Sequence, residues 1–505
     1  AAKDINNFRE NVQDDYLPLS SDITYEGLFY DYYFDAGEKQ ECSKLFCPSY
    51  TYAISKDPFS KNDEYYLSVG LNSNIKESDF HRKKLNLVIV LDISGSMSSR
   101  FDSYYYDRFR GTPVEGAENA TQDDYEKSKM QIAEESIVAL LDHLNEDDRL
   151  GIVLFDDRAY LAKPLELVNK TDVEKIKAHI LEIQPQGGTY MEAGMKMGTE
   201  LFEGHEGSDQ SEYENRIIFL TDAMPNIGVT DEEGLLGMTK KNAENKIYAT
   251  FIGIGVDFNT ELVEAMTKIR GANYYSVHSS SQFKNRMDDE FEFMVTPLVF
   301  NLILNLDAKG YEIIKVYGSP EANESTGTLM KVSTLFPSSK EGAETRGGLV
   351  LLKLKKIFNE TSLKLTVSYE DRLGKADTDE VVVNLEEKQP DFFQNTGIRK
   401  GILLARYADL MKNWINDERQ NYTAEGSVKP SITKETGIIA PPSDEEPQLG
   451  RWERQSIALR VSDGYKALIS EFAAYFRNEM ESIGDPALNK EILILEKLSN
   501  YSSSV

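Results

Sequence analysis

The middle of the chain, residues 85–296, alternates between short apolar runs and stretches with helical periodicity. Runs of aliphatic residues are typical of strands buried on both faces. Four such strands are predicted, at residues 85–91, 150–155, 216–220 and 247–255, and a short fifth strand is predicted at residues 273–277. The stretch 127–144 instead places its apolar residues on one face of a helix. Strands separated by helices predict an α/β fold, with a doubly wound, mostly parallel sheet covered on both faces.

The pattern differs on both sides of this region. Residues 297–390 contain strand-like segments about 10 to 20 residues apart, a rhythm typical of an antiparallel β-sandwich. Residues 1–84 are predicted to form a small N-terminal β region that packs with this sandwich, because they have too few apolar residues to stand alone. Residues 391–505 return to helical periodicity and form a predicted C-terminal helical region, with a proline-rich loop near 424–449.

Charge narrows the range of partners. The 505 residues include 56 Lys plus Arg against 85 Asp plus Glu, which gives a formal net charge of −29. This acidity argues against nucleic acid or an anionic membrane as the main partner. No apolar stretch reaches the roughly 18 to 20 residues of a transmembrane helix, so no transmembrane segment is predicted in this chain.

Cysteines and sequons bear on the cellular compartment. The chain has two cysteines, Cys42 and Cys47, whose spacing allows either a local disulfide or two buried free thiols. Six N-x-S/T sequons permit a secretory route without establishing it, at Asn119, Asn169, Asn323, Asn359, Asn421 and Asn500. The chain begins with Ala-Ala in place of Met, which removal of a signal peptide would explain. We predict a secreted or cell-surface protein, with a cytoplasmic location as the alternative.

Oxygen-bearing side chains follow the predicted strands at three separate places. Asp92, Ser94 and Ser96 follow the first strand, Thr189 lies in a Gly-Gly-Thr loop, and Asp222 follows the third strand. The carboxyl ends of parallel strands meet at one edge of a sheet, where α/β proteins bind ligands. Hydroxyl and carboxylate oxygens are the ligands that Mg²⁺ and Ca²⁺ accept. The pattern therefore predicts that these five residues converge on one divalent cation.

This pattern resembles the von Willebrand factor type A domain with its metal-ion-dependent adhesion site, over roughly residues 85–295. The resemblance implies that the hydroxyls of Ser94, Ser96 and Thr189 bind the cation, and that Asp92 and Asp222 bind it directly or through water. It implies Mg²⁺, or Ca²⁺ or Mn²⁺ instead, with one open position for the carboxylate of an Asp or Glu on a protein partner. The flanking β regions also resemble, in layout, larger proteins of this kind such as inter-alpha-trypsin inhibitor heavy chains.

One departure from the family pattern lies beside the metal motif. The helix that usually follows the motif within a few residues begins here near residue 127, so roughly residues 99–125 are inserted. Tyr and Arg dominate binding hot spots. We therefore predict that the insertion contacts the partner through Tyr104, Tyr105, Tyr106, Arg108, Phe109 and Arg110; the alternative is a solvated loop.

The predicted function is a divalent-cation-dependent adhesion or protein-binding module, and not an enzyme. One alternative is an intracellular subunit that docks onto an AAA ATPase, as some domains of this family do. The other is a metal-assisted hydrolase, for which the sequence near the motif offers no evident general base. The five histidines are scattered without a metal-site or triad spacing, and neither a P-loop nor a nucleophile-elbow motif is present.

Overall fold

The computed structural model describes most of the chain. The described residues are 5–35, 42–74, 81–100, 123, 126–205, 211–223, 234–254, 265–266, 268–277, 279–337, 340–341, 344–346, 348–420, 429–434, 436–439 and 457–502. Within these ranges no helix combines the length and the apolar character needed to cross a membrane.

The α/β region contains a six-stranded sheet, and the predicted fold class is confirmed. Its strands run in the order β6 (Ala159–Leu167), β5 (Arg149–Phe155), β4 (Lys84–Asp92), β7 (Tyr213–Thr221), β8 (Ile247–Ile254) and β9 (Asn273–Val277). All neighbours are parallel except β6, which pairs antiparallel with β5 at the edge. The five predicted strands correspond to β4, β5, β7, β8 and β9, whereas β6 was not predicted. Its half-exposed residues and Pro164, which only an edge strand tolerates, hide it in the sequence.

Helices cover both faces of this sheet, and the side chains of β4 alternate between them. Leu87 and Ile89 share a core with Ile137, and Val88 and Val90 share another with Met195. The first face carries α4 (Lys129–Leu141), α5 (Val173–Ile180), α9 (Ser280–Met287) and α10 (Phe291–Val295); the second carries α6 (Met191–Glu200) and α7 (Leu235–Glu244).

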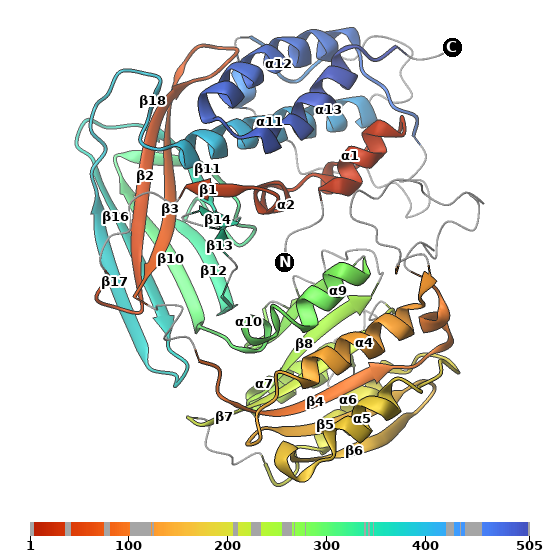
Figure 1. Cartoon of the computed structure of the whole chain (residues 1–505). Coiled ribbons are helices and arrows are strands. Elements are labelled where there is room, and N and C mark those ends of the chain that lie inside the picture. The colour runs from red at the N-terminus through yellow and green to blue at the C-terminus, as the bar shows by residue number, and fades with distance from the viewer. Residues whose placement is uncertain are drawn as a thin grey trace.

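Two antiparallel sheets form the adjoining sandwich (Figure 1). One sheet has the order β12 (Thr328–Leu335), β10 (Val299–Lys309), β16 (Ser362–Glu370) and β17 (Ala376–Val383). The other has the order β11 (Tyr311–Tyr317), β15 (Val350–Lys356), β3 (Asp63–Ser73), β2 (Phe46–Lys56) and β18 (Phe392–Phe393). Strands from both flanks of the α/β region therefore share one sheet. A small sheet is formed by β1 (Tyr33–Asp35), β14 (Glu344–Arg346) and β13 (Lys340–Glu341).

The helical layer rests on the outer face of the second sheet. Along β15, Leu352 faces the sandwich core, whereas its neighbour Leu351 shares a core with Leu403 of the long helix. This layer comprises α11 (Thr396–Gln420), α12 (Asp463–Ile483) and α13 (Asn489–Ser499), together with α1 (Asn6–Gln13) and α2 (Tyr25–Tyr30). Residues 6–13 are thus helical, although the whole of residues 1–84 was predicted as a β region. Phe8 and Val12 lie four residues apart, on one helical face, and are buried in the same core.

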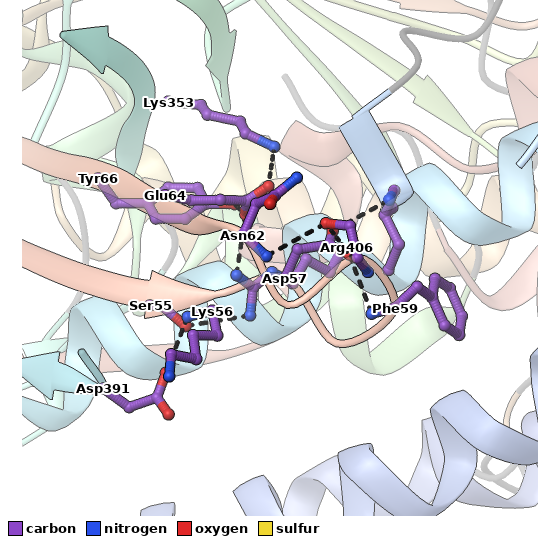
Figure 2. A network of polar contacts seen from close by, with 12 residues as sticks. Ser55, Lys56, Asp57, Phe59, Asn62, Glu64, Tyr66, Lys353, Asp391 and Arg406 are labelled. Carbon is purple, nitrogen blue, oxygen red and sulfur yellow. Dashed lines mark hydrogen bonds and ion pairs between the residues drawn. The ribbon is translucent and has the colours of Figure 1, made fainter. Parts of the chain in front are cut away.

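A buried polar network ties α11 to the sandwich (Figure 2). Arg406 of α11 donates to Glu64 Oε2 at 2.9 Å and to Ser55 Oγ at 3.2 Å. Lys353 Nζ donates to the other oxygen of Glu64 at 2.5 Å, and the Tyr66 hydroxyl donates to Oε2 at 2.6 Å. The Glu64 carboxylate therefore faces two cations and a hydroxyl, as a buried charge requires if it is to be compensated.

The structure joins Cys42 and Cys47 in a disulfide at the start of β2. The free-thiol alternative is not realised in it. Division of the chain at residues 84/85, 296/297 and 390/391 remains a prediction.

Candidate metal site

The candidate site lies where the order of the sheet reverses. β4 and β7 are adjacent and parallel, but the chain leaves β4 towards β5 on one side and leaves β7 towards β8 on the other. The helices that make these two crossings, α4 and α7, lie on opposite faces of the sheet. The order of the strands therefore reverses at the carboxyl ends of β4 and β7, which is the usual place of the ligand site in such sheets. Asp92 ends β4, and Asp222 follows the last residue of β7.

Asp92 is held by two hydrogen bonds at the carboxyl end of β4. Its side chain is fully buried. Oδ1 accepts the backbone N–H of Ser94 at 2.8 Å, and Oδ2 accepts the hydroxyl of Thr221 at 2.6 Å. The turn after β4 thereby folds back on its own carboxylate, which fixes the direction of the two serines that follow. Thr221, the last residue of β7, was not singled out from the sequence, although it directly precedes Asp222.

The two serine hydroxyls connect the Asp92 turn to Asp222. Ser94 Oγ and Ser96 Oγ are 3.0 Å apart, and Ser96 Oγ donates to Asp222 Oδ1 at 2.7 Å. Ser96 lies in the short 3₁₀ helix η3 (Gly95–Ser98) and is exposed, whereas Ser94 is buried. The structure thus brings four of the five predicted metal ligands into one cluster of oxygens with an opening to solvent at Ser96.

Thr189 is exposed at the same edge, directly before α6. Its loop is fastened to the Asp92 turn through the backbone, because Gly95 N donates to Gly187 O at 3.1 Å and Gln186 N donates to Ile93 O at 2.7 Å. Asp157 crowds this loop: a Cβ added to Gly188 would lie 2.4 Å from its Oδ1. The Thr189 loop can approach Asp157 so closely only because residue 188 is a glycine.

Burial and charge disfavour the ionised form of Asp92. Desolvation raises the pKa of its carboxyl to about 6, against hydrogen bonds from Thr221 and Ser94 that lower it, and the negative charge of Asp222 adds to the rise. A bound cation would relieve this unfavourable charge on the buried Asp92 carboxylate. The chemistry of the donor set therefore fits a hard divalent ion.

Lys129 is a part of the site that the sequence did not reveal. Its Nζ lies 3.2 Å from Asp222 Oδ2, and both side chains are almost completely buried. Lys129 is the first residue of α4, where the partial positive charge of the helix N-terminus disfavours a cation. In the sequence, the available signal was a lysine in the first turn of a helix, a position where a positive charge is unfavourable.

The six residues predicted to contact a partner, from Tyr104 to Arg110, lie outside the described residues. The positions on either side of the insertion are described. Arg100 and Ser128 form an antiparallel bridge, and Lys129 N donates to Ser99 O at 2.8 Å. The insertion therefore leaves the fold and returns to it at the same place, next to Ser96 and the metal motif.

Asp156 and Asp157 are adjacent carboxylates beside the loop that carries Thr189. Asp156 is buried and its carboxylate accepts from the backbone of Arg158 and the hydroxyl of Tyr160. Among the described residues, no group of three or more His, Cys, Asp or Glu is placed to hold a metal ion. A cation site in this part of the chain therefore depends on hydroxyl oxygens, and these gather at Ser94 and Ser96.

Comparisons with known proteins identify the domain that carries these residues. Residues 87–224 match the family model of the von Willebrand factor type A domain, so the chain contains such a domain. Inter-alpha-trypsin inhibitor heavy chain H4 of Bos taurus is 23% identical over 237 residues, covering 45% of this chain and 22% of that protein. An uncharacterised protein of Synechocystis is 26% identical over 222 residues, covering 42% of this chain and 44% of that protein. The chain thus spans less than half the length of these curated relatives.

Two solved structures are similar to this chain over part of its length. A von Willebrand factor type A protein from Catenulispora acidiphila matches 76% of this chain and 84% of that chain, with 16% identity and a TM-score of 0.42. Proximal thread matrix protein 1 from the mussel byssus, in a form with a zinc-occupied metal-ion-dependent adhesion site, matches 43% of this chain and 49% of that chain, with 20% identity and a TM-score of 0.31.

Proposed function

We propose that the von Willebrand factor type A domain of this chain, a protein-interaction module, binds its partner through a divalent cation held by Ser94, Ser96 and Asp222. Asp92 and Thr189 complete the set, directly or through water. The single observation that supports this most is the hydrogen-bonded chain from Asp92 through both serines to Asp222, at the point where the sheet order reverses. Mg²⁺ is the first choice of ion, with Ca²⁺ and Mn²⁺ as alternatives.

The ligand types determine what such a cation can do. Hydroxyls are neutral, so they leave more positive charge on the ion than a third carboxylate would. A carboxylate of an Asp or Glu on the partner is the natural ligand for the remaining position. Asp92, below the serines, fixes the turn by accepting from Ser94 N and Thr221. Ser96 faces solvent and marks the side from which the partner approaches.

We propose binding rather than hydrolysis. Among the described residues, the side chains that hydrogen-bond to Asp92 and Asp222 are hydroxyls and the ammonium of Lys129. None of these is a general base at neutral pH. A secreted or cell-surface location is favoured over an ATPase-bound intracellular one by the Cys42–Cys47 disulfide, since disulfides persist in oxidising compartments. Four sequon asparagines are exposed and open to glycosylation, at Asn169, Asn323, Asn359 and Asn500.

The test is isothermal titration of Mg²⁺ and Mn²⁺ into the full chain and two variants. Asp222→Asn removes a carboxylate of the site and should weaken divalent binding by about 100-fold or more, roughly 2.7 kcal/mol. Asp157→Asn is the matched control, because it removes an exposed carboxylate beside Gly188 that lies outside the hydrogen-bonded chain. Its affinity should stay within about twofold of the wild type. Equal affinities for all three proteins would refute the site.

The partner chemistry is tested at saturating Mg²⁺. An acidic peptide should bind the wild type, and the same peptide with Gln and Asn in place of Glu and Asp should not. Chelation of the metal should abolish binding of the acidic peptide. Binding that survives chelation would show that the partner is held elsewhere. A deletion of residues 101–122 should then change which peptides bind without changing the affinity for the metal.

A further inference from the structure

We propose that Lys129 sets the electrostatic character of the metal site, as a built-in cation that weakens divalent binding and strengthens capture of an anionic partner. The inference rests on the proposed function and goes beyond it, because it assigns a specificity-determining role to a residue outside the metal motif. Lys129 Nζ lies 3.2 Å from Asp222 Oδ2. The side chain of Lys129 is 7% exposed and that of Asp222 is 2% exposed.

Asp222 uses its two oxygens for different partners. Oδ1 accepts from Ser96 Oγ at 2.7 Å, on the side where the hydroxyls gather, and Oδ2 accepts from Lys129. A divalent ion among the hydroxyls would therefore meet Oδ1 and leave the ammonium in place on Oδ2. Lysine and metal can be bound by the same carboxylate at the same time.

Charge balance then gives Lys129 two opposite effects. Asp92 and Asp222 contribute two negative charges, which a divalent cation alone would neutralise. When a divalent cation is bound, the charges of Asp92, Asp222, Lys129 and the ion sum to one positive charge. The ammonium repels the incoming metal ion, and it attracts the carboxylate that completes the coordination. In a buried setting such effects are screened far less than at the surface.

The ammonium is held in place by the structure around it. Lys129 begins α4, whose N-terminus is fixed by a capping box between Ser128 and Gln131. Its backbone N–H donates to Ser99 O, three residues after Ser96, so the helix start and the metal turn form one unit. The ammonium of Lys129 is therefore held at a fixed position in the site. Because Lys129 directly follows the insertion, its side chain also connects the end of the insertion to Asp222.

The experiment compares Lys129→Met with Lys129→Arg. Methionine keeps much of the length of the side chain and removes the charge, whereas arginine keeps the charge. Lys129→Met should bind Mg²⁺ and Mn²⁺ about 10- to 100-fold more tightly than the wild type. At saturating metal, it should bind an acidic peptide at least about 10-fold more weakly. Lys129→Arg should stay within about threefold of the wild type in both measurements.

The outcomes separate this inference from the proposed function. If wild type and Lys129→Met bind divalent ions equally, or if the peptide affinity rises in the variant, the role of Lys129 is refuted while the site stands. If Lys129→Met binds divalent ions and the wild type does not, Lys129 is a competing cation and the proposed function of the wild-type site fails. If neither protein binds a divalent ion, both proposals fail. Circular dichroism of each variant without metal confirms that it is folded.

Discussion

Two buried carboxylates in this molecule, Glu64 and Asp222, each pair with a lysine, yet their surroundings have opposite charge. Glu64 faces Lys353 and Arg406, so one carboxylate meets two cations (Figure 2). At the metal site the ammonium of Lys129 pairs with Asp222, whereas the described contacts of Asp92 are a hydroxyl and a backbone N–H. Among the described residues, the first cluster has one positive charge more than it has carboxylates, whereas the second has one fewer.

This difference separates a structural cluster from a binding site. A buried carboxylate whose negative charge is already compensated by cationic side chains gains nothing from a further cation. Such a cluster fixes the packing of the helices and strands that carry it. A buried pair of carboxylates with too little positive charge is costly, and a bound cation removes the cost. Both clusters are made of acidic and basic residues in the interior. The balance of charge, rather than burial, identifies the one that can take a ligand.

The largest expected effect comes from removing the carboxylate of the compensated cluster. Glu64→Gln leaves Lys353 and Arg406 buried without their counter-charge and should lower the free energy of unfolding by about 3–5 kcal/mol. Urea denaturation of wild type and variant measures the loss. The divalent affinity should be unchanged, because the variant does not touch the α/β region.

A surface ion pair is the control for this prediction. Lys364 Nζ and Glu380 Oε2 are 3.1 Å apart on neighbouring strands of the sandwich, but both side chains are largely exposed. Glu380→Gln should change stability by no more than about 0.5 kcal/mol. A comparable loss in both variants would mean that the burial of the Glu64 cluster contributes nothing.

The divalent affinity of the metal site should depend on pH. Burial raises the pKa of Asp92 to about 6, so below this pH a proton competes with the cation. The divalent affinity should be constant above about pH 7 and should fall by about tenfold, or 1.4 kcal/mol, per pH unit well below 6. Titrations at several pH values measure this slope. A constant affinity down to about pH 4, where an ordinary Asp titrates, would contradict it.

Much of the fold and the metal motif could be predicted because they depend on local patterns. Apolar runs marked β4 and β7, and the ends of parallel strands must share one edge, so Asp92 and Asp222 could be placed together from sequence. Long-range contacts left no such signal. Lys129 and Asp222 are 93 positions apart, and Glu64 and Lys353 are 289 positions apart.

The missed elements have related explanations. The helix α1 has eight residues, fewer than a helix needs to be stable alone in water, and it is stabilised by packing on α13 at the opposite end of the chain. The edge strand β6 is half exposed and contains Pro164, so its pattern lacks the continuous apolar run that marked its neighbours. Both elements are determined by tertiary contacts rather than by their own sequence.

The smallest change in stability is expected for a third buried carboxylate, Glu134. Glu134, on α4, is buried, and among the described residues its Oε1 has no hydrogen-bond partner. Burial raises the pKa of its carboxyl to about 7, and the charge of Glu135 adds to the rise. It therefore has neither the cations of Glu64 nor the hydroxyls of Asp222.

The sign of its pH effect follows from this raised pKa. The folded chain binds a proton at Glu134 up to about pH 7, whereas in the unfolded chain the carboxyl ionises near pH 4.5, so Glu134 lowers stability as pH rises between these values. Glu134→Gln should therefore stabilise the protein by about 1–2 kcal/mol at pH 8 and by close to nothing at pH 4. Urea denaturation at the two pH values measures the difference.

Glu135→Gln is the neighbouring control. Glu135 pairs with Lys127 and Lys284, so its loss should not stabilise the protein at pH 8. An equal gain in both variants would show that the general negative charge of α4, and not the unpartnered carboxylate, is the cause.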